Sequence, residues 1–93
     1  MRILYFNSFL KNLKSLPYQK RLKIENSIKT FVSCLENKDQ IPLGFGLKKL
    51  AKGNLWEIRT GLDLRIVFTI KSDILSFVFV GKHNEVKRYL KAQ

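Results

Sequence analysis

The side chains of this 93-residue chain that could take part in chemistry gather in its C-terminal half. They are Glu57, Arg59, Arg65, Lys82 and His83, and His83 is the only histidine. Guanidinium and ammonium groups bind anions such as phosphate, and carboxylate and imidazole groups can accept or donate protons. These residue types point to a site for an anionic ligand, provided that the fold brings them together.

The overall charge also favours an anionic partner. Eighteen Lys and Arg residues against seven Asp and Glu residues give a net charge of +11. Small, strongly basic proteins favour polyanions, so nucleic acid is the leading class of partner and an acidic protein is the second. An anionic membrane surface ranks third, because no long apolar segment and no lipidation signal are present.

The composition predicts a single folded domain over residues 1–93. Hydrophobic residues make up 45% of the chain, which is enough for one modest core. The first nine residues, MRILYFNSF, are too short and too polar for a secretion signal. The only cysteine, Cys34, fits a reducing cytoplasm. One cysteine and one histidine do not make a metal site, and no cofactor is expected.

A strand and two helices are expected in the N-terminal half. Residues 2–6, RILYF, predict the strand, and Asn7 or Ser8 could cap the helix that follows it. Pro17 interrupts this helix and suits the start of the next one. Apolar residues recur at helical spacing across residues 18–37, so this segment predicts a longer amphipathic helix.

After a loop at residues 37–46 the apolar pattern alternates, as is typical of strands. Strands are expected at residues 47–50, 55–59, 64–70 and 74–81, and residues 84–93 close the chain as a basic helix or an irregular tail. The predicted fold class is therefore α+β: a strand and two helices, then an antiparallel meander and a short C-terminal end.

The alternation divides the strand residues between two faces of the sheet. The helices should cover a core face formed by Trp56, Ile58, Leu64, Ile66 and Phe68. Glu57, Arg59 and Arg65 then point to the opposite face.

This opposite face is expected to be a shallow surface floored by Val67, Ser76 and Val78. If the last hairpin turns at residues 72–73, Arg65 lies beside Val80, close to where Lys82 and His83 emerge. The imidazole would then join two arginines, a carboxylate and a lysine on one face.

Each of these residues also has a simpler structural explanation. Glu57 and Arg59 could form a weak, exposed ion pair. Arg65 could cap the hairpin, and His83 could be solvated. The convergence of these groups on one face of a basic protein is what favours a functional surface.

Residues 46–91 carry an ordered set of motifs that resembles the RelE/ParE superfamily of toxins from toxin–antitoxin modules. The motifs are Lys48-Lys49-Leu50, Gly53 to Arg59, Leu64 to Phe68 and Val80 to Val86. The N-terminal half shares only the order of its elements with the family. The resemblance implies a microbial RNase-like fold and, for RelE-type members, metal-independent cleavage of mRNA in the ribosomal A site.

In that reaction the ribose 2′-hydroxyl attacks the adjacent phosphate and leaves a 2′,3′-cyclic phosphate and a 5′-hydroxyl. A base, cations for the phosphorane charge and an acid for the leaving oxygen are needed. Position by position, the resemblance implies that Arg65 stabilises the phosphorane and Arg59 binds phosphate. It assigns Glu57 as the base and His83 as the acid.

The resemblance also implies that Lys48, Lys49, Lys82 and Lys87 bind the RNA backbone. The chain departs from the family pattern at one position. RelE-like members often carry a tyrosine that takes part in cleavage after the Glu-Val step, whereas this chain has Lys87 there and its nearest tyrosine is Tyr89. Either residue takes over that role, or the activity is weak or absent.

Three functions are compatible with these residues. The first is a ribosome-dependent mRNA interferase, which inhibits translation, and the second is a ParE-like inhibitor of DNA gyrase. The third is an inactive basic binding module. His83 with Arg65 and Glu57 favours the first, and the missing tyrosine favours the other two. Either toxin implies a cognate acidic antitoxin that folds as it binds.

Overall fold

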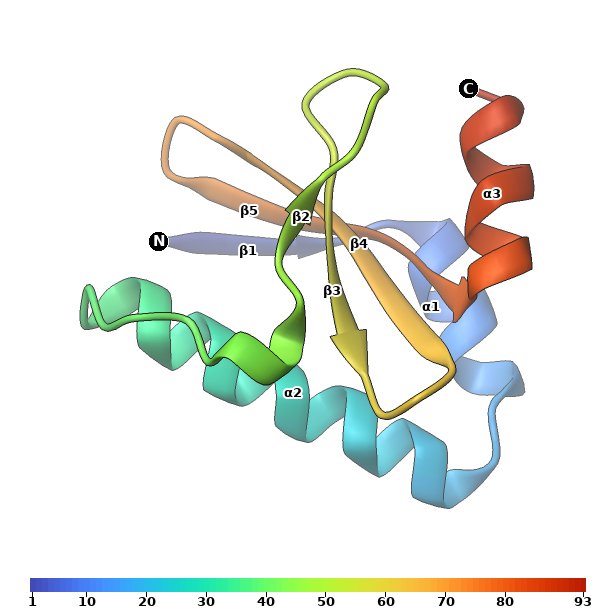
Figure 1. The fold of residues 1–93 in the computed structure, drawn as a ribbon, viewed down its shortest axis with the longest axis horizontal. Coiled ribbons are helices and arrows are strands. Elements are labelled where there is room, and N and C mark those ends of the chain that lie inside the picture. The colour runs from blue at the N-terminus through green and yellow to red at the C-terminus, as the bar shows by residue number, and fades with distance from the viewer.

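Three helices and a mixed five-stranded sheet make up the fold in a computed structural model that describes residues 1–93 (Figure 1). The elements in chain order are β1 (Arg2–Tyr5), α1 (Asn7–Ser15), α2 (Tyr18–Glu36), the 3-10 turn η1 (Leu43–Phe45), β2 (Lys48–Lys49), β3 (Trp56–Thr60), β4 (Leu64–Lys71), β5 (Ile74–Lys82) and α3 (His83–Lys91). The predicted α+β order is confirmed. None of the helices is long and apolar enough to cross a bilayer.

The strands lie in the order β1-β5-β4-β3-β2. Strands β2 to β5 form the expected antiparallel meander. Strand β1 pairs in parallel with β5 and forms one edge of the sheet. The sequence pattern identified β1 as a strand but did not indicate its neighbour.

The core lies between the sheet and the α1–α2 pair, as expected. Phe9 of α1 and Ile24 and Phe31 of α2 are buried against Ile58 and Ile66 of the sheet, with exposed fractions of at most 1%. Burying side chains of this size contributes about 1.5–3 kcal/mol each. This packing holds α2 across the ends of β3 and β4 (Figure 1).

Helix α3 covers the other face of the sheet, so the expectation of an open floor there is wrong. Val86, Tyr89 and Leu90 recur at helical spacing and pack over Val67 and Val78 in a second apolar cluster. The Tyr89 ring stacks on the Phe79 ring with centroids 4.4 Å apart. Such a stack adds to the apolar area that the helix buries.

A β-bulge in β5 shifts the predicted register by one residue. Phe68 pairs with Phe77, but Val67 pairs with Phe79, so Val78 is the extra residue. As a result Arg65 lies opposite Gly81 and not Val80, which instead joins the main core.

Polar side chains of α1 bind the bulged strand. The Ser8 hydroxyl donates to the carbonyl of Val78, and the Asn12 amide donates to the carbonyl of Val80 at 3.0 Å. Ser8 therefore does not cap α1, whose N-cap is Phe6 without a side-chain hydrogen bond. The capping expected of Asn7 or Ser8 is therefore absent, and the Ser8 hydroxyl binds β5 instead.

Candidate functional site

A buried ion pair lies at the centre of the candidate site. The Arg65 Nη1 group donates to Glu57 Oε2 at 3.0 Å, from β4 to β3. Glu57 is only 4% exposed, and the Arg65 side chain is 19% exposed. A carboxylate so deeply buried needs a partner, and that partner is Arg65. The simpler explanation, an exposed pair between Glu57 and Arg59, is wrong.

Arg65 keeps an unused donor in this arrangement. Its Nε atom is buried and has no hydrogen-bond partner. A guanidinium group carries five N–H donors in a fixed plane, and buried donors normally find acceptors. The pair with Glu57 therefore orients Arg65 and leaves its Nε–H without an acceptor, while the side chain as a whole stays partly exposed.

Arg59 adds a second positive charge directly opposite Arg65. Like charges at opposite positions of neighbouring strands destabilise a sheet, and Glu57 offsets part of that cost. The Arg59 side chain lies against Gly46, where an added Cβ would come within 2.6 Å of the Arg59 Nε atom. Gly46 also has φ of +54°, so its lack of a side chain serves both the turn and the arginine.

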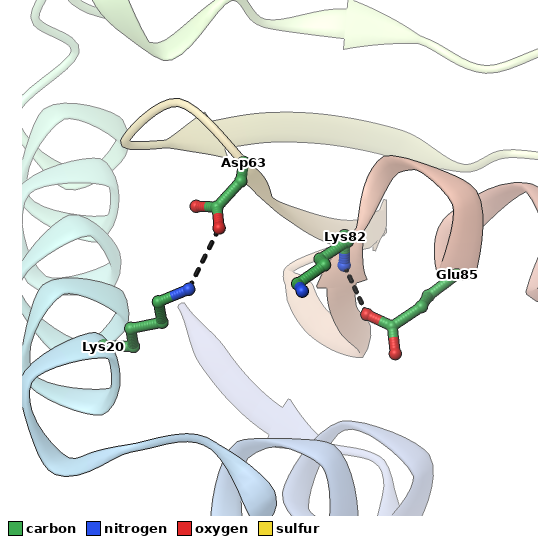
Figure 2. Close-up of polar contacts among 4 residues, drawn as sticks. All are labelled: Lys20, Asp63, Lys82 and Glu85. Carbon is green, nitrogen blue, oxygen red and sulfur yellow. Dashed lines mark hydrogen bonds and ion pairs between the residues drawn. The ribbon is translucent and has the colours of Figure 1, made fainter.

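His83 is the first residue of α3 and lies exposed two positions after Gly81, the residue opposite Arg65. The helix starts there because Glu85 accepts a hydrogen bond from the Lys82 backbone N–H at 2.7 Å (Figure 2). Lys87, also exposed, follows His83 by four residues and shares its side of the helix.

The lysines expected to bind RNA lie on different faces. Lys48 is opposite Glu57, on the same face as Arg65. The Lys49 Nζ atom instead lies 5.9 Å from the centre of the Trp56 ring, on the face that α1 and α2 cover. Lys82 pairs with Leu64 and also emerges on that face, because the bulge shifted the register. Of these four lysines, Lys48 shares the Arg65 face and Lys87 lies on the helix that covers it.

Tyr89 is half-buried in its stack on Phe79, within the second apolar cluster. Its ring is used to hold α3 on the sheet. Lys87 is exposed, so it is the freer of the two residues that could stand in for the family tyrosine.

Asp63 is a charged residue whose contacts were not predicted. Its Oδ2 atom accepts a hydrogen bond from Lys20 Nζ at 3.0 Å and links the β3–β4 turn to α2 (Figure 2). This hydrogen bond lowers the pKa of Asp63, and the charge of Lys82 lowers it further. The motif Gly61-Leu62-Asp63 indicated only a turn, and no local pattern pointed to a lysine 43 residues earlier in the chain.

The arrangement provides cations for a phosphate and an exposed imidazole at the end of β5. It contains no group of three or more His, Cys, Asp or Glu side chains that could hold a metal ion. Anion binding and proton transfer are thus the chemistry that these side chains can supply.

Comparison with solved structures gives full-length matches, although no protein-family model and no curated protein matches the chain. The RelB–RelE antitoxin–toxin complex of Methanococcus jannaschii matches with 26% identity, a TM-score of 0.69, and coverage of 92% of this chain and 96% of that one. The E. coli DinJ–YafQ toxin–antitoxin complex matches with 22% identity, a TM-score of 0.70, and coverage of 90% and 93%. The E. coli RelBE complex matches with 19% identity, a TM-score of 0.63, and coverage of 87% and 94%.

The chain has the α+β fold of the RelE-like toxins, and the resemblance predicted from its motifs is confirmed at this level. The solved structures named above are YafQ and RelE toxins with their partners. They give no support to the ParE-like part of the resemblance.

Proposed function

We propose that this protein is the toxin of a type II toxin–antitoxin pair and cleaves mRNA at the ribosome. The observation that carries the proposal is the partly exposed Arg65 guanidinium, which is oriented by buried Glu57. Arg59 lies opposite it, and the only imidazole follows two residues after Gly81. The activity would take place in the cytoplasm.

In this proposal Arg65 and Arg59 neutralise the charge that develops on the phosphorane as the 2′-hydroxyl attacks. The 2′-hydroxyl gives its proton to water as it bonds to phosphorus, and His83 donates a proton to the 5′-oxygen as the P–O5′ bond breaks. Glu57 has a different role from the base suggested by the resemblance. Its carboxylate is buried and accepts a hydrogen bond from Arg65, so it suits a positioning residue better than a group that reaches a ribose.

The proposed antitoxin fits an exposed apolar surface on and beside β1. Strand β1 is an edge of the sheet, and Leu4, Tyr5, Phe6 and Leu10 expose 39–45% of their surface beside it. Unpaired strand edges accept an additional strand, with alternate side chains in flanking grooves. An extended antitoxin segment with acidic and apolar residues would match both the edge and the net charge of +11.

The experiment is inducible expression followed by primer extension on a cellular mRNA. Arg65→Lys is the sharpest variant, because lysine keeps a positive charge beside Glu57 but lacks the planar guanidinium that can bind a phosphate through two N–H groups. We expect mapped cuts with the wild type and about a hundredfold fewer with Arg65→Lys or His83→Ala. Lys29→Ala, on the exposed surface of α2, is the matched control and should cut as the wild type does. Growth arrest with DNA breaks and no mRNA cuts would contradict the proposal.

An inactive binding module is the second candidate. It is favoured by one observation: the only nearby tyrosine, Tyr89, is stacked on Phe79 in an apolar cluster. This alternative predicts that the wild type binds RNA or its antitoxin but produces neither mRNA cuts nor growth arrest.

A further inference from the structure

A basic cleft lies where β3 ends and β4 begins, beside the first half of α2 and on the face opposite to Arg65. Its volume is about 440 Å³, and its lining comprises Lys20, Lys23, Thr60, Gly61, Leu62, Asp63 and Leu64. The two lysines come from α2, and the other residues come from the turn between β3 and β4 with its flanking positions. The proposed cleavage reaction uses none of these side chains.

Lys20 and Lys23 line this cleft together with the Asp63 carboxylate, and the charge of Lys82 also acts on Asp63. The Lys20 Nζ atom lies 3.0 Å from Asp63 Oδ2, and both side chains are partly exposed. The Lys82 side chain extends on the same side as Lys20 and Asp63, whereas Glu85 lies on the other side of the Lys82 backbone (Figure 2). Neither Lys23 nor Lys82 makes an ion pair. The lining thus carries two positive charges and one negative charge, and Lys82 near Asp63 adds a third positive charge.

Thr60 provides an independent indication of a ligand. The residue is only 5% exposed, and its hydroxyl is buried without a hydrogen-bond partner. Buried hydroxyl groups are normally paired, and an unpaired one weakens the folded state. A free donor in the wall of a basic cleft suits a phosphate oxygen as its missing acceptor.

We infer that this cleft binds a phosphate of an RNA backbone and that the Asp63 carboxylate occupies the phosphate position in the free protein. The inference rests on the proposed function for the identity of the polyanion as RNA. Leu64 and Lys82 are paired one position along the strands from Arg65 and Gly81, a rise of about 3.4 Å. RNA bound at Arg65 therefore continues around the end of the sheet into the cleft.

The test uses 2′-O-methyl oligoribonucleotides, which lack the attacking 2′-hydroxyl, so binding is measured without cleavage. The Lys20→Ala/Lys23→Ala double variant should bind about tenfold more weakly, with a salt slope smaller by about 0.7 for each lost phosphate contact. Lys11→Ala/Lys29→Ala removes the same charge from α1 and α2 outside the cleft. Equal losses in both double variants would overturn the inference.

Two further variants distinguish a specific phosphate-binding site from a general effect of net charge on RNA affinity. Thr60→Val changes no charge and should weaken oligonucleotide binding about two- to tenfold through the lost donor, while urea unfolding shows a fold at least as stable. Asp63→Asn should tighten binding, and more so than Glu36→Gln, which removes one negative charge near the far end of α2. Thr60→Val with unchanged affinity for both the oligonucleotide and the ribosome would count against a phosphate site, and so would equal effects of Asp63→Asn and Glu36→Gln on both.

Co-sedimentation with ribosomes identifies the source of the phosphate. If the Lys20→Ala/Lys23→Ala variant loses oligonucleotide affinity, the phosphate belongs to the substrate strand. If it loses only ribosome binding, the phosphate belongs to ribosomal RNA, and the site stands. If it keeps both, the inference is wrong. Absence of cleavage by the wild type would reject the proposed function and leave this binding test intact.

Discussion

Arg59 and Arg65 occupy directly opposite positions on β3 and β4, and the carboxylate that compensates them, Glu57, lies two residues before Arg59 on the same face. Two guanidinium groups in this relationship are unfavourable for the free protein. The pairing is explained if an anion binds there, because a phosphate would then be shared by both groups.

The first prediction concerns the stability of the Arg65–Glu57 pair. Arg65→Ala leaves a buried carboxylate without its partner, which should lower the free energy of unfolding by about 3 kcal/mol. Arg65→Lys keeps a cation at this position and should lower the free energy of unfolding by only about 1 kcal/mol. Urea denaturation of both variants measures the difference. Equal stabilities would show that the pair does not compensate the burial of Glu57.

The second prediction concerns Gly46. Gly46→Ala places a methyl group within van der Waals overlap of the Arg59 guanidinium and at φ of +54°, so we expect a loss of about 1–2 kcal/mol and a displaced Arg59. Gly44→Ala is the matched control, because nothing lies within 4 Å of its added Cβ. Urea denaturation and oligonucleotide binding should both change for Gly46→Ala only. If Gly44→Ala has the same effect, the contact with Arg59 is not the cause.

The third prediction concerns the β-bulge. Ser8→Ala removes the donor to the Val78 carbonyl and should destabilise the protein by about 1–2 kcal/mol, since that carbonyl lies at the bulge. Ser15→Ala removes only an exposed, local bond to Asn12 and should cost less than about 0.5 kcal/mol. Hydrogen exchange of the amides of β5 would report the expected loosening. Unchanged exchange in Ser8→Ala would mean that the bulge does not depend on α1.

The fold was largely predictable from the sequence, whereas the geometry of the site was not. Periodicity predicted α2 and the meander because long amphipathic segments carry a strong local signal. The bulge at Val78 carries no such signal, and a shift of one residue moved Lys82 to the other face. The burial of Glu57 and the contact of Lys20 with Asp63 depend on tertiary packing between segments distant in sequence.

The fourth prediction concerns pH. The pKa of Asp63 is lowered from its ordinary value of 3.8, first by the hydrogen bond from Lys20. A lowered pKa means that the pair stabilises the protein above pH 3.8 and that this contribution is lost as the pH falls through the lowered value. The difference in unfolding free energy between wild type and Asp63→Asn should therefore shrink on acidification. It should also shrink in 1 M salt, because the pair is exposed. A difference that is independent of pH would contradict the ion pair.

The fifth prediction decides between Lys87 and Tyr89 as the residue in place of the family tyrosine. The Tyr89 ring packs on Phe79, while its hydroxyl has no hydrogen bond, so Tyr89→Phe should keep both stability and mRNA cleavage. Tyr89→Ala should cost about 2 kcal/mol by removing a half-buried ring. Lys87→Ala should leave stability within about 0.5 kcal/mol, because the side chain is exposed, and reduce cleavage strongly. Primer extension and urea denaturation separate the two effects, and a loss of cleavage in Tyr89→Phe would return the role to Tyr89.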